Sequence, residues 1–330
     1  MEKTSQQLTA NSGAAWWAYV KMRFPIPVYL LLSGGLALSG AAQAGGGEFA
    51  GGLINFKTLA SFLYAIWLFG TLRLMDELKD YDKDVIANPT RPMPQGWLTK
   101  THVGRVIQYL MLIGMLGSFA FALHSGWAAG LALVTTVWLW LMYREFYIGE
   151  ALGKNPLAYA ITHQIILIPF CLLMAASQDA GRASVMIIED PHPWIPFVSR
   201  EFLGAKTASI LAWSVAVLGS FFSYEVSRKQ DADAHPVLAT YRQTYGIKGS
   251  AIIVMFLTLI AIGGALNTGL TFWMVPFSVL TFLSYILLLF KHRAHKVIEA
   301  TATLSLFFHI WAPILNALIF GTLSGTSGSN

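Results

Sequence analysis

The sequence predicts an all-α, polytopic membrane protein with about nine transmembrane helices, and three observations support this. Of its 330 residues, 55% are hydrophobic and only 12% are charged, with a mean hydropathy of +0.56. A soluble domain carries roughly 25% charged residues, so lipid replaces water over much of the expected surface. Nine apolar stretches are long enough to cross a bilayer, and lysine and arginine gather in alternate connections between them.

The nine stretches are placed with a window of roughly 20 mostly apolar residues, the length that crosses a hydrocarbon core about 30 Å thick. The expected spans are 26–45, 58–77, 102–123, 127–146, 157–177, 205–226, 250–268, 271–290 and 299–322. Two connections, 78–101 and 227–249, are long and polar. We expect one transmembrane domain over residues 25–323, after an N-terminal cytoplasmic or interfacial segment, 1–24, and before a short polar tail, 324–330.

The basic residues give an independent check on this topology. The connections on the side of the N-terminus hold eighteen of the 22 lysines and arginines, and the other side holds Lys57, Arg182, Arg200 and Lys206. Positive charge accumulates in cytoplasmic loops, so we expect a cytoplasmic N-terminus and a bacterial inner-membrane location. The net charge of +5 fits anionic lipid, and nucleic acid is not an expected partner.

The segment before the first span contains Trp16, Trp17 and Tyr19 beside Lys21 and Arg23. Aromatic and basic side chains are enriched where membranes meet water. The segment therefore predicts a helix at the level of the lipid headgroups.

An acidic segment ends the second span, with Asp76, Asp80 and Asp84 recurring every fourth residue and Glu77 beside them. If the helix continues, these carboxylates share a face and repel one another. A divalent cation would compensate this repulsion, and magnesium is usually held by one or two carboxylates plus substrate phosphates. The alternative is a solvated helix end whose carboxylates pair with Lys79 and Lys83.

A proline-rich turn follows the acidic segment over residues 88–96. Proline fixes its own φ and biases the preceding residue away from helix, so this turn is expected to be stiff and extended. It can hold Arg91 near the carboxylates, where a planar guanidinium suits a phosphate.

A second polar cluster closes the sixth span, on the same expected side of the membrane. Glu225, Lys229 and Asp233 recur every fourth residue, with Arg228 beside them. Taken alone, this pattern is more typical of a solvated helix end.

The two clusters together resemble the motifs of the UbiA superfamily of intramembrane prenyltransferases. Asp76-Glu77-x-x-Asp80-x-x-x-Asp84 is similar to its first motif, NDxxDxxxD, and Arg91-Pro-Met-Pro-x-Gly96 to its RPxPxG turn. The second motif, DxxxDxxxD, has a counterpart in Glu225-x-x-x-Lys229-x-x-x-Asp233. The resemblance extends over the chain, in the number of helices and the position of both motifs.

The resemblance implies a helical bundle around a central cavity open to lipid. It also implies transfer of a prenyl group from a polyprenyl diphosphate to a lipophilic, often aromatic or quinone-like, acceptor through an allylic carbocation. Magnesium would be held by Asp76, Glu77, Asp80, Asp84, Glu225 and Asp233. Asp76, Asp80 and Lys229 would be catalytic, and the diphosphate ligands would be Arg91, Tyr143, Arg144, Arg228 and Lys229.

Two positions depart from the family pattern. Asp76 replaces the usual asparagine, and Lys229 replaces the central aspartate of the second motif. A positive charge at Lys229 leaves the number of magnesium ions at one or two. We expect Lys229 and Arg228 to contact the diphosphate directly and partly replace metal.

Other residues have two interpretations each. Tyr143 and Arg144, at the end of the fourth span, are either diphosphate ligands or an interfacial tyrosine with a cytoplasmic arginine. His163 and Gln164, inside the fifth span, are either functional or hydrogen-bonded between helices.

Two other outcomes share the predicted architecture. The first alternative is a membrane terpene cyclase or a diphosphate-releasing relative. The second is a lipid-binding or transport protein without catalysis. Transport sites more often lie near the midplane on broken helices, whereas these carboxylates lie at helix ends.

Overall fold

The computed structural model describes residues 8–44, 54–123, 125–178, 200–291 and 294–321, with the side chains of 200–206 left out. Within these residues, nine helices are long and apolar enough to span a membrane, which confirms the predicted fold class. The predicted tail 324–330 and the charges of Lys3, Arg182 and Arg293 lie outside the described residues.

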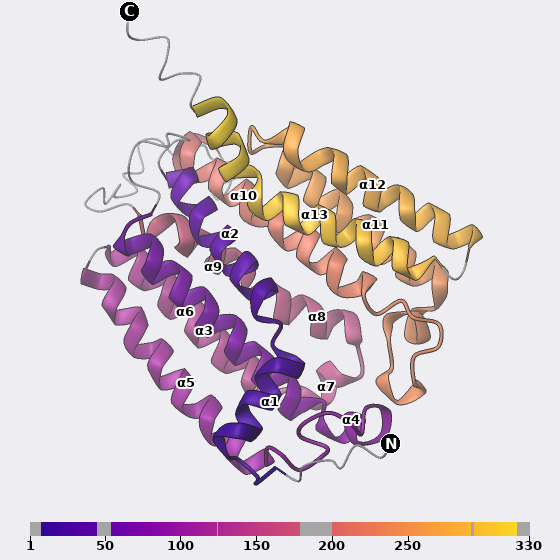
Figure 1. Ribbon diagram of the computed structural model, residues 1–330. Helices are drawn as coiled ribbons and strands as arrows, with labels where there is room; N and C mark the ends of the chain where they lie inside the picture. Colours follow the sequence, from indigo (N-terminus) through magenta and orange to yellow (C-terminus); the bar gives the residue numbers. More distant parts are fainter. Residues whose placement is uncertain (1–7, 45–53, 124, 179–199, 292–293, 322–330) are drawn as a thin grey trace, which may run out of the picture.

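The first half of the chain begins with α1 and continues through five spans, the fifth built from two consecutive helices (Figure 1). Its elements are α1 (Gly13–Arg23), α2 (Ile26–Ala44), α3 (Phe56–Lys79), α4 (Tyr81–Ala87), α5 (Lys100–Ala120), η1 (Phe121–Leu123), α6 (Gly126–Tyr143), η2 (Glu145–Tyr147), α7 (Gly149–Gly153), α8 (Pro156–Gln164) and α9 (Leu167–Ala176).

The second half contains four long helices, coloured salmon to yellow in Figure 1. Its elements are α10 (Arg200–Ser227), η3 (Pro236–Leu238), α11 (Tyr241–Leu266), α12 (Thr271–Phe290), α13 (His295–Asn316) and η4 (Ala317–Gly321). The two halves are joined mainly where α2 packs on α13 and α9 packs on α10.

Several helices begin at residues whose side chains accept a hydrogen bond from the first turn. Asn55, Thr99, Ser125 and Asn155 cap α3, α5, α6 and α8 in this way, and Thr240 forms a capping box with Gln243 at the start of α11. A cap satisfies backbone N–H groups that have no partner within the helix. These caps define where the spans start.

The N-terminal helix α1 is attached to the bundle by its ends and by one face. Asn11 accepts a hydrogen bond from the Thr99 backbone N–H at 3.0 Å, and Trp16 Nε1 donates to His102 Nε2 at 3.3 Å. Tyr19 is buried against the core, whereas Trp17 is exposed with Lys21 Nζ 5.0 Å from its ring centroid. The predicted helix at this place is confirmed, and the structure adds its attachment to the start of α5.

Close contact between α10 and α11 depends on small residues. A Cβ on Gly264 would lie 2.6 Å from Ala216 N and 2.7 Å from Ala212 O. The neighbouring Gly263 has open space, with nothing within 4 Å of such an atom. Gly264 therefore lets the backbones approach, a feature typical of helix pairs in membranes.

We predict that Gly264→Ala lowers the unfolding temperature of the detergent-solubilised protein, because overpacking against backbone costs about 1–3 kcal/mol. Gly263→Ala is the matched control, since both changes add the same helix propensity. Thermal unfolding followed by tryptophan fluorescence measures both. Equal melting temperatures for the two variants would contradict the packing account.

Candidate active site

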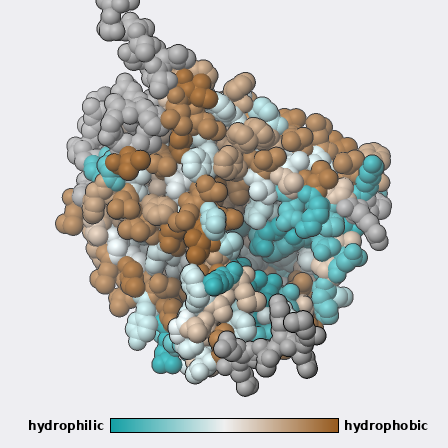
Figure 2. Space-filling view, viewed as in Figure 1, coloured by the Kyte–Doolittle hydropathy of each residue, from teal (hydrophilic) through white to brown (hydrophobic). Residues whose placement is uncertain are grey.

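The two acidic segments meet at one end of the bundle. The short helix α4, after the first segment, contacts η3, after the second. Figure 2 shows hydrophilic residues gathered around a hollow on this face, between the region of α4 and the connection from α10 to α11. The charge of Asp76 interacts with those of Glu225 and Arg228. The second cluster therefore lies at the same end of the bundle as the first.

The first segment is not one continuous helix, which corrects the expected register. Helix α3 ends at Lys79, and Asp80, with φ −83° and ψ 0°, joins it to α4. Backbone hydrogen bonds still run from Asp80 N to Asp76 O at 2.9 Å and from Asp84 N to Asp80 O at 2.8 Å. Asp84 is buried whereas Asp76 is exposed, so the two carboxylates have different environments.

Asp76 and Asp80 are the two carboxylates of the first motif without an ion pair among the described residues. Asp76 is exposed and Asp80 half-buried. The charges of Asp76 and Asp80 repel each other. Among the cations, Arg73 and then Arg228 interact most strongly with the charge of Asp76. These two carboxylates are therefore available to a ligand.

Glu77 has a different environment, because two guanidinium groups share one of its oxygens. Arg23 Nε lies 2.6 Å and Arg73 Nη2 2.5 Å from Glu77 Oε1, and the Glu77 side chain is 1% exposed. Glu77 Oε2 and Arg73 Nε are buried without a hydrogen-bond partner. Burial, followed by the charge of Glu77, raises the pKa of the nearby Tyr19 phenol.

Asp84 holds the proline-rich turn. Its Oδ1 accepts a hydrogen bond from Asn88 Nδ2 at 2.9 Å, and its Oδ2 pairs with Arg91 Nη1. Arg91 thus lies beside a carboxylate, as expected. The segment is a series of hydrogen-bonded turns and not the expected extended one, with Gln95 N donating to Arg91 O at 3.0 Å and Gly96 N to Met93 O at 2.9 Å. Both oxygens of Asp84 are occupied by residues of its own segment.

The second cluster also departs from the expected register. Helix α10 ends at Ser227, so Lys229 and Asp233 lie beyond the helix and do not continue the face of Glu225. Glu225 Oε2 accepts from Arg228 Nε and Oε1 from Lys229 Nζ, both at 2.6 Å. Asp233 is exposed, and its backbone N–H donates to Asp231 Oδ1 at 3.0 Å. The Glu225 carboxylate raises the pKa of Arg228.

Tyr143 and Arg144 lie at the end of α6, in a groove whose lining also includes Leu78 and Glu145. Arg144 is exposed, with its guanidinium carbon 5.3 Å from the Tyr147 ring centroid. The structure brings these residues to the end of α3. It shows no ion pair or hydrogen bond from either side chain to the acidic motifs within the described chain.

A polar cluster around Lys79 was missed by sequence reasoning. Lys79 Nζ contacts the Tyr159 hydroxyl, lies 3.1 Å from Glu145 Oε1 and 3.4 Å from His163 Nε2. The His163 Nδ1 lies 2.7 Å from the Tyr159 carbonyl oxygen, which can accept only if this nitrogen carries the proton. His163 therefore links α8 to α3, in agreement with the interhelical interpretation.

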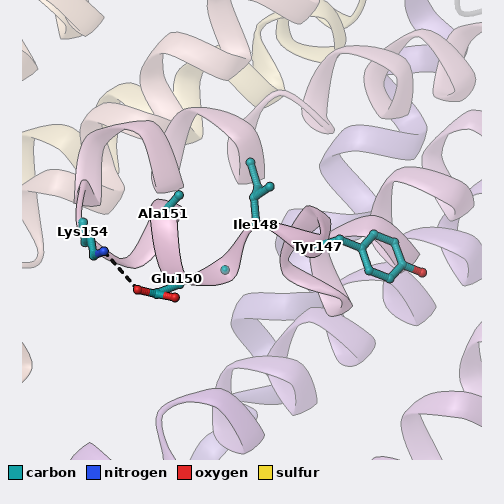
Figure 3. A pocket seen from close by; sticks show the side chains of 6 residues that line it. Tyr147, Ile148, Glu150, Ala151 and Lys154 are labelled. Carbon is teal, nitrogen blue, oxygen red and sulfur yellow. Dashed lines mark hydrogen bonds and ion pairs between the residues drawn. The ribbon is translucent and has the colours of Figure 1, made fainter.

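Glu145 reaches Lys79 from a left-handed turn. The φ angles of Glu145, Phe146 and Tyr147 are 49°, 54° and 59°, a region that non-glycine residues seldom adopt. Beyond this turn, Figure 3 shows Glu150 and Lys154, whose exposed ion pair measures 3.1 Å. No local sequence pattern marks the left-handed turn or the pairing of Arg23 with Glu77, whereas Arg73 and Glu77 have the i,i+4 spacing of a helical ion pair.

The donor set at Asp76 and Asp80 fits magnesium in one respect. Among the described residues, no three His, Cys, Asp or Glu side chains form a ligand group. Magnesium is usually held by only one or two carboxylates together with substrate phosphates. Two unpaired carboxylates beside cationic side chains match this partial coordination.

We predict that Arg91→Ala destabilises the protein by about 1–3 kcal/mol, because it leaves the buried Asp84 carboxylate without a charged partner. Lys100→Ala serves as the control. It removes an exposed pair with Asp82, which contributes little. Chemical or thermal unfolding in detergent measures both changes, and an Arg91→Ala variant as stable as the control would refute the assigned role.

No protein-family model matches the sequence, and a comparison with curated proteins finds no match. Two solved structures share the fold. A digeranylgeranylglyceryl phosphate synthase aligns at a TM-score of 0.58 and 14% identity, over 92% of this chain and 99% of its own. A UbiA homologue from Aeropyrum pernix K1 aligns at 0.55 and 16%, over 88% and 98%. The chain thus has the helical-bundle fold of these UbiA-type proteins along nearly its whole described length.

Proposed function

We propose that the protein is a magnesium-dependent intramembrane prenyltransferase. It transfers a prenyl group from a polyprenyl diphosphate to a lipophilic, aromatic or quinone-like acceptor. The observation that carries this proposal is two carboxylates, Asp76 and Asp80, that have no ion pair among the described residues and lie at one end of the bundle, where the charge of Arg228 acts on Asp76. The fold shared with two UbiA-type structures supports it.

The cations around the carboxylates suit a diphosphate. Arginine forms bidentate, charge-assisted hydrogen bonds with phosphate oxygens, and Arg73 and Arg228 both interact with the charge of Asp76. Lys229 shares Glu225 with Arg228. An anion bound between the two motifs would therefore meet positive charge from both halves of the chain.

The proposed reaction breaks the bond between the allylic carbon and the diphosphate oxygen, and the electron pair leaves with the diphosphate. The acceptor then supplies an electron pair to the allylic cation and loses a proton. Bound magnesium would neutralise charge that develops on the leaving group. Arg228 and Lys229 would hold the diphosphate in place and stabilise it by preorganised electrostatics.

The membrane context fits a lipophilic donor and acceptor. The site lies at helix ends, and exposed apolar side chains such as Leu112, Leu116 and Phe256 cover the outer surfaces of the spans. We infer that this end faces the cytoplasm, because most basic residues lie on its side. The inferred location is a bacterial inner membrane.

We predict that Asp76→Asn and Asp80→Asn each lower magnesium-dependent release of diphosphate at least about 100-fold, because each removes a metal-ligand charge worth several kcal/mol in the transition state. Asp82→Asn is the matched control, since Asp82 is exposed and pairs with Lys100. The assay uses geranyl, farnesyl and geranylgeranyl diphosphates with a membrane lipid extract, and mass spectrometry of the products.

Three outcomes separate the hypotheses. Prenylated acceptor supports the proposal, whereas a cyclised or hydrolysed prenyl product without acceptor identifies a cyclase or diphosphate-releasing enzyme. Tight donor binding with no diphosphate release from any donor would refute enzymatic function and favour a lipid-binding protein.

A further inference from the structure

We propose that the site takes a single divalent ion, at Asp76 and Asp80, and that Glu77, Asp84 and Glu225 act as positioning residues for diphosphate-binding cations. This inference rests on the proposed function and deepens it. It assigns different tasks to carboxylates that the motif pattern treats alike.

Glu225 is the decisive residue, because the second metal position of the motif pattern would have to use it. Each of its oxygens lies 2.6 Å from a cationic nitrogen, one of Arg228 and one of Lys229, and its side chain is 15% exposed. A metal ion at Glu225 would displace these partners and lie beside the Lys229 ammonium group. Like charges at such separations repel strongly in a partly buried site.

The Glu77 carboxylate is also occupied by cationic partners. It binds Arg23 from α1 and Arg73 from α3 through one oxygen, and its side chain is almost wholly buried. Removing one partner of such a group leaves an uncompensated buried charge. Arg73 Nε is itself buried without a hydrogen-bond partner.

Asp84 completes the set by pairing with Arg91 and Asn88. Three carboxylates thus hold five cations, so the positive charge of the cations exceeds the negative charge of their carboxylate partners by two. The cations are Arg23, Arg73, Arg91, Arg228 and Lys229. Asp76 and Asp80 balance this excess without a ligand, and a divalent ion bound to them would leave it for the diphosphate. The excess supplies, from fixed side chains, positive charge that a second metal ion would otherwise bring.

The departure at Lys229 is explained by the same arrangement. A lysine in place of the central aspartate of the second motif removes one metal-ligand position. It also adds a cation that Glu225 holds in place, with Nζ 5.8 Å from the Tyr241 ring centroid. The Lys229 ammonium group would thus take the place that a metal ion has in the family motif.

The test measures Mn²⁺ bound to the purified full-length protein by electron paramagnetic resonance, with geranyl S-thiolodiphosphate as a poorly reactive donor analogue. We expect one Mn²⁺ per chain. Asp76→Asn and Asp80→Asn should weaken Mn²⁺ binding about 10- to 100-fold, by analogy with losses at metal sites.

Glu225→Gln and Lys229→Gln should each leave Mn²⁺ affinity within about twofold and weaken analogue binding about tenfold, the loss of one charge-assisted hydrogen bond. Two variants are used because Glu225→Gln frees two cations, whereas Lys229→Gln keeps the Arg228 pair. Glu150→Gln, which breaks an exposed pair of the same i,i+4 kind, should change neither measurement.

Two Mn²⁺ ions bound with the analogue, or loss of an ion in Glu225→Gln, would overturn the single-ion inference and leave prenyl transfer intact. A wild-type protein that binds neither the analogue nor Mn²⁺ would overturn both the inference and the proposed function.

Discussion

The charges at the end of the bundle have to be compensated where water is scarce, and this constraint organises the site. Glu77 and Glu225 each hold two cations through contacts of 2.5–2.6 Å. Burying a carboxylate without a charged partner costs free energy. These ion pairs avoid that cost when no ligand is bound. Because Arg23 comes from α1, the N-terminal helix becomes part of the same charge network.

Packing deeper in the bundle determines where these charges meet. Helices α10 and α11 approach closely at Gly264 and Gly219, where a Cβ would lie 2.6 Å from backbone nitrogen atoms. Helices α2 and α9 connect the halves through their contacts with α13 and α10. The ends of α3 and α10 are thereby brought to one face, although 149 residues separate Asp76 from Glu225 in the sequence. The position of the charged residues therefore depends on helix packing in the interior of the bundle.

Hydropathy and charge asymmetry predicted the nine spans because both are local properties, and the expected bounds agree with the helices to within a few residues at most ends. The meeting of the two acidic clusters was also predictable, since alternate loops share a side. The ion pairs between distant residues were not, although Arg73–Glu77 and Lys229–Glu225 have i,i+4 spacing. Periodicity assumes an unbroken helix, whereas Asp80 interrupts the first segment and Ser227 ends α10 before Lys229. The Arg23 partner of Glu77 and the partners of Lys79 lie 54 and 66 or more residues away, beyond any spacing rule.

The division of carboxylates into two free ligands and three paired ones is the central claim about this site. The most direct measurement is the anomalous scattering of Mn²⁺ in crystals of the protein with a thiolodiphosphate donor analogue. The account predicts one anomalous peak, between Asp76 and Asp80, with Glu225 still paired to Arg228 and Lys229. A second peak coordinated by Glu225 would contradict it.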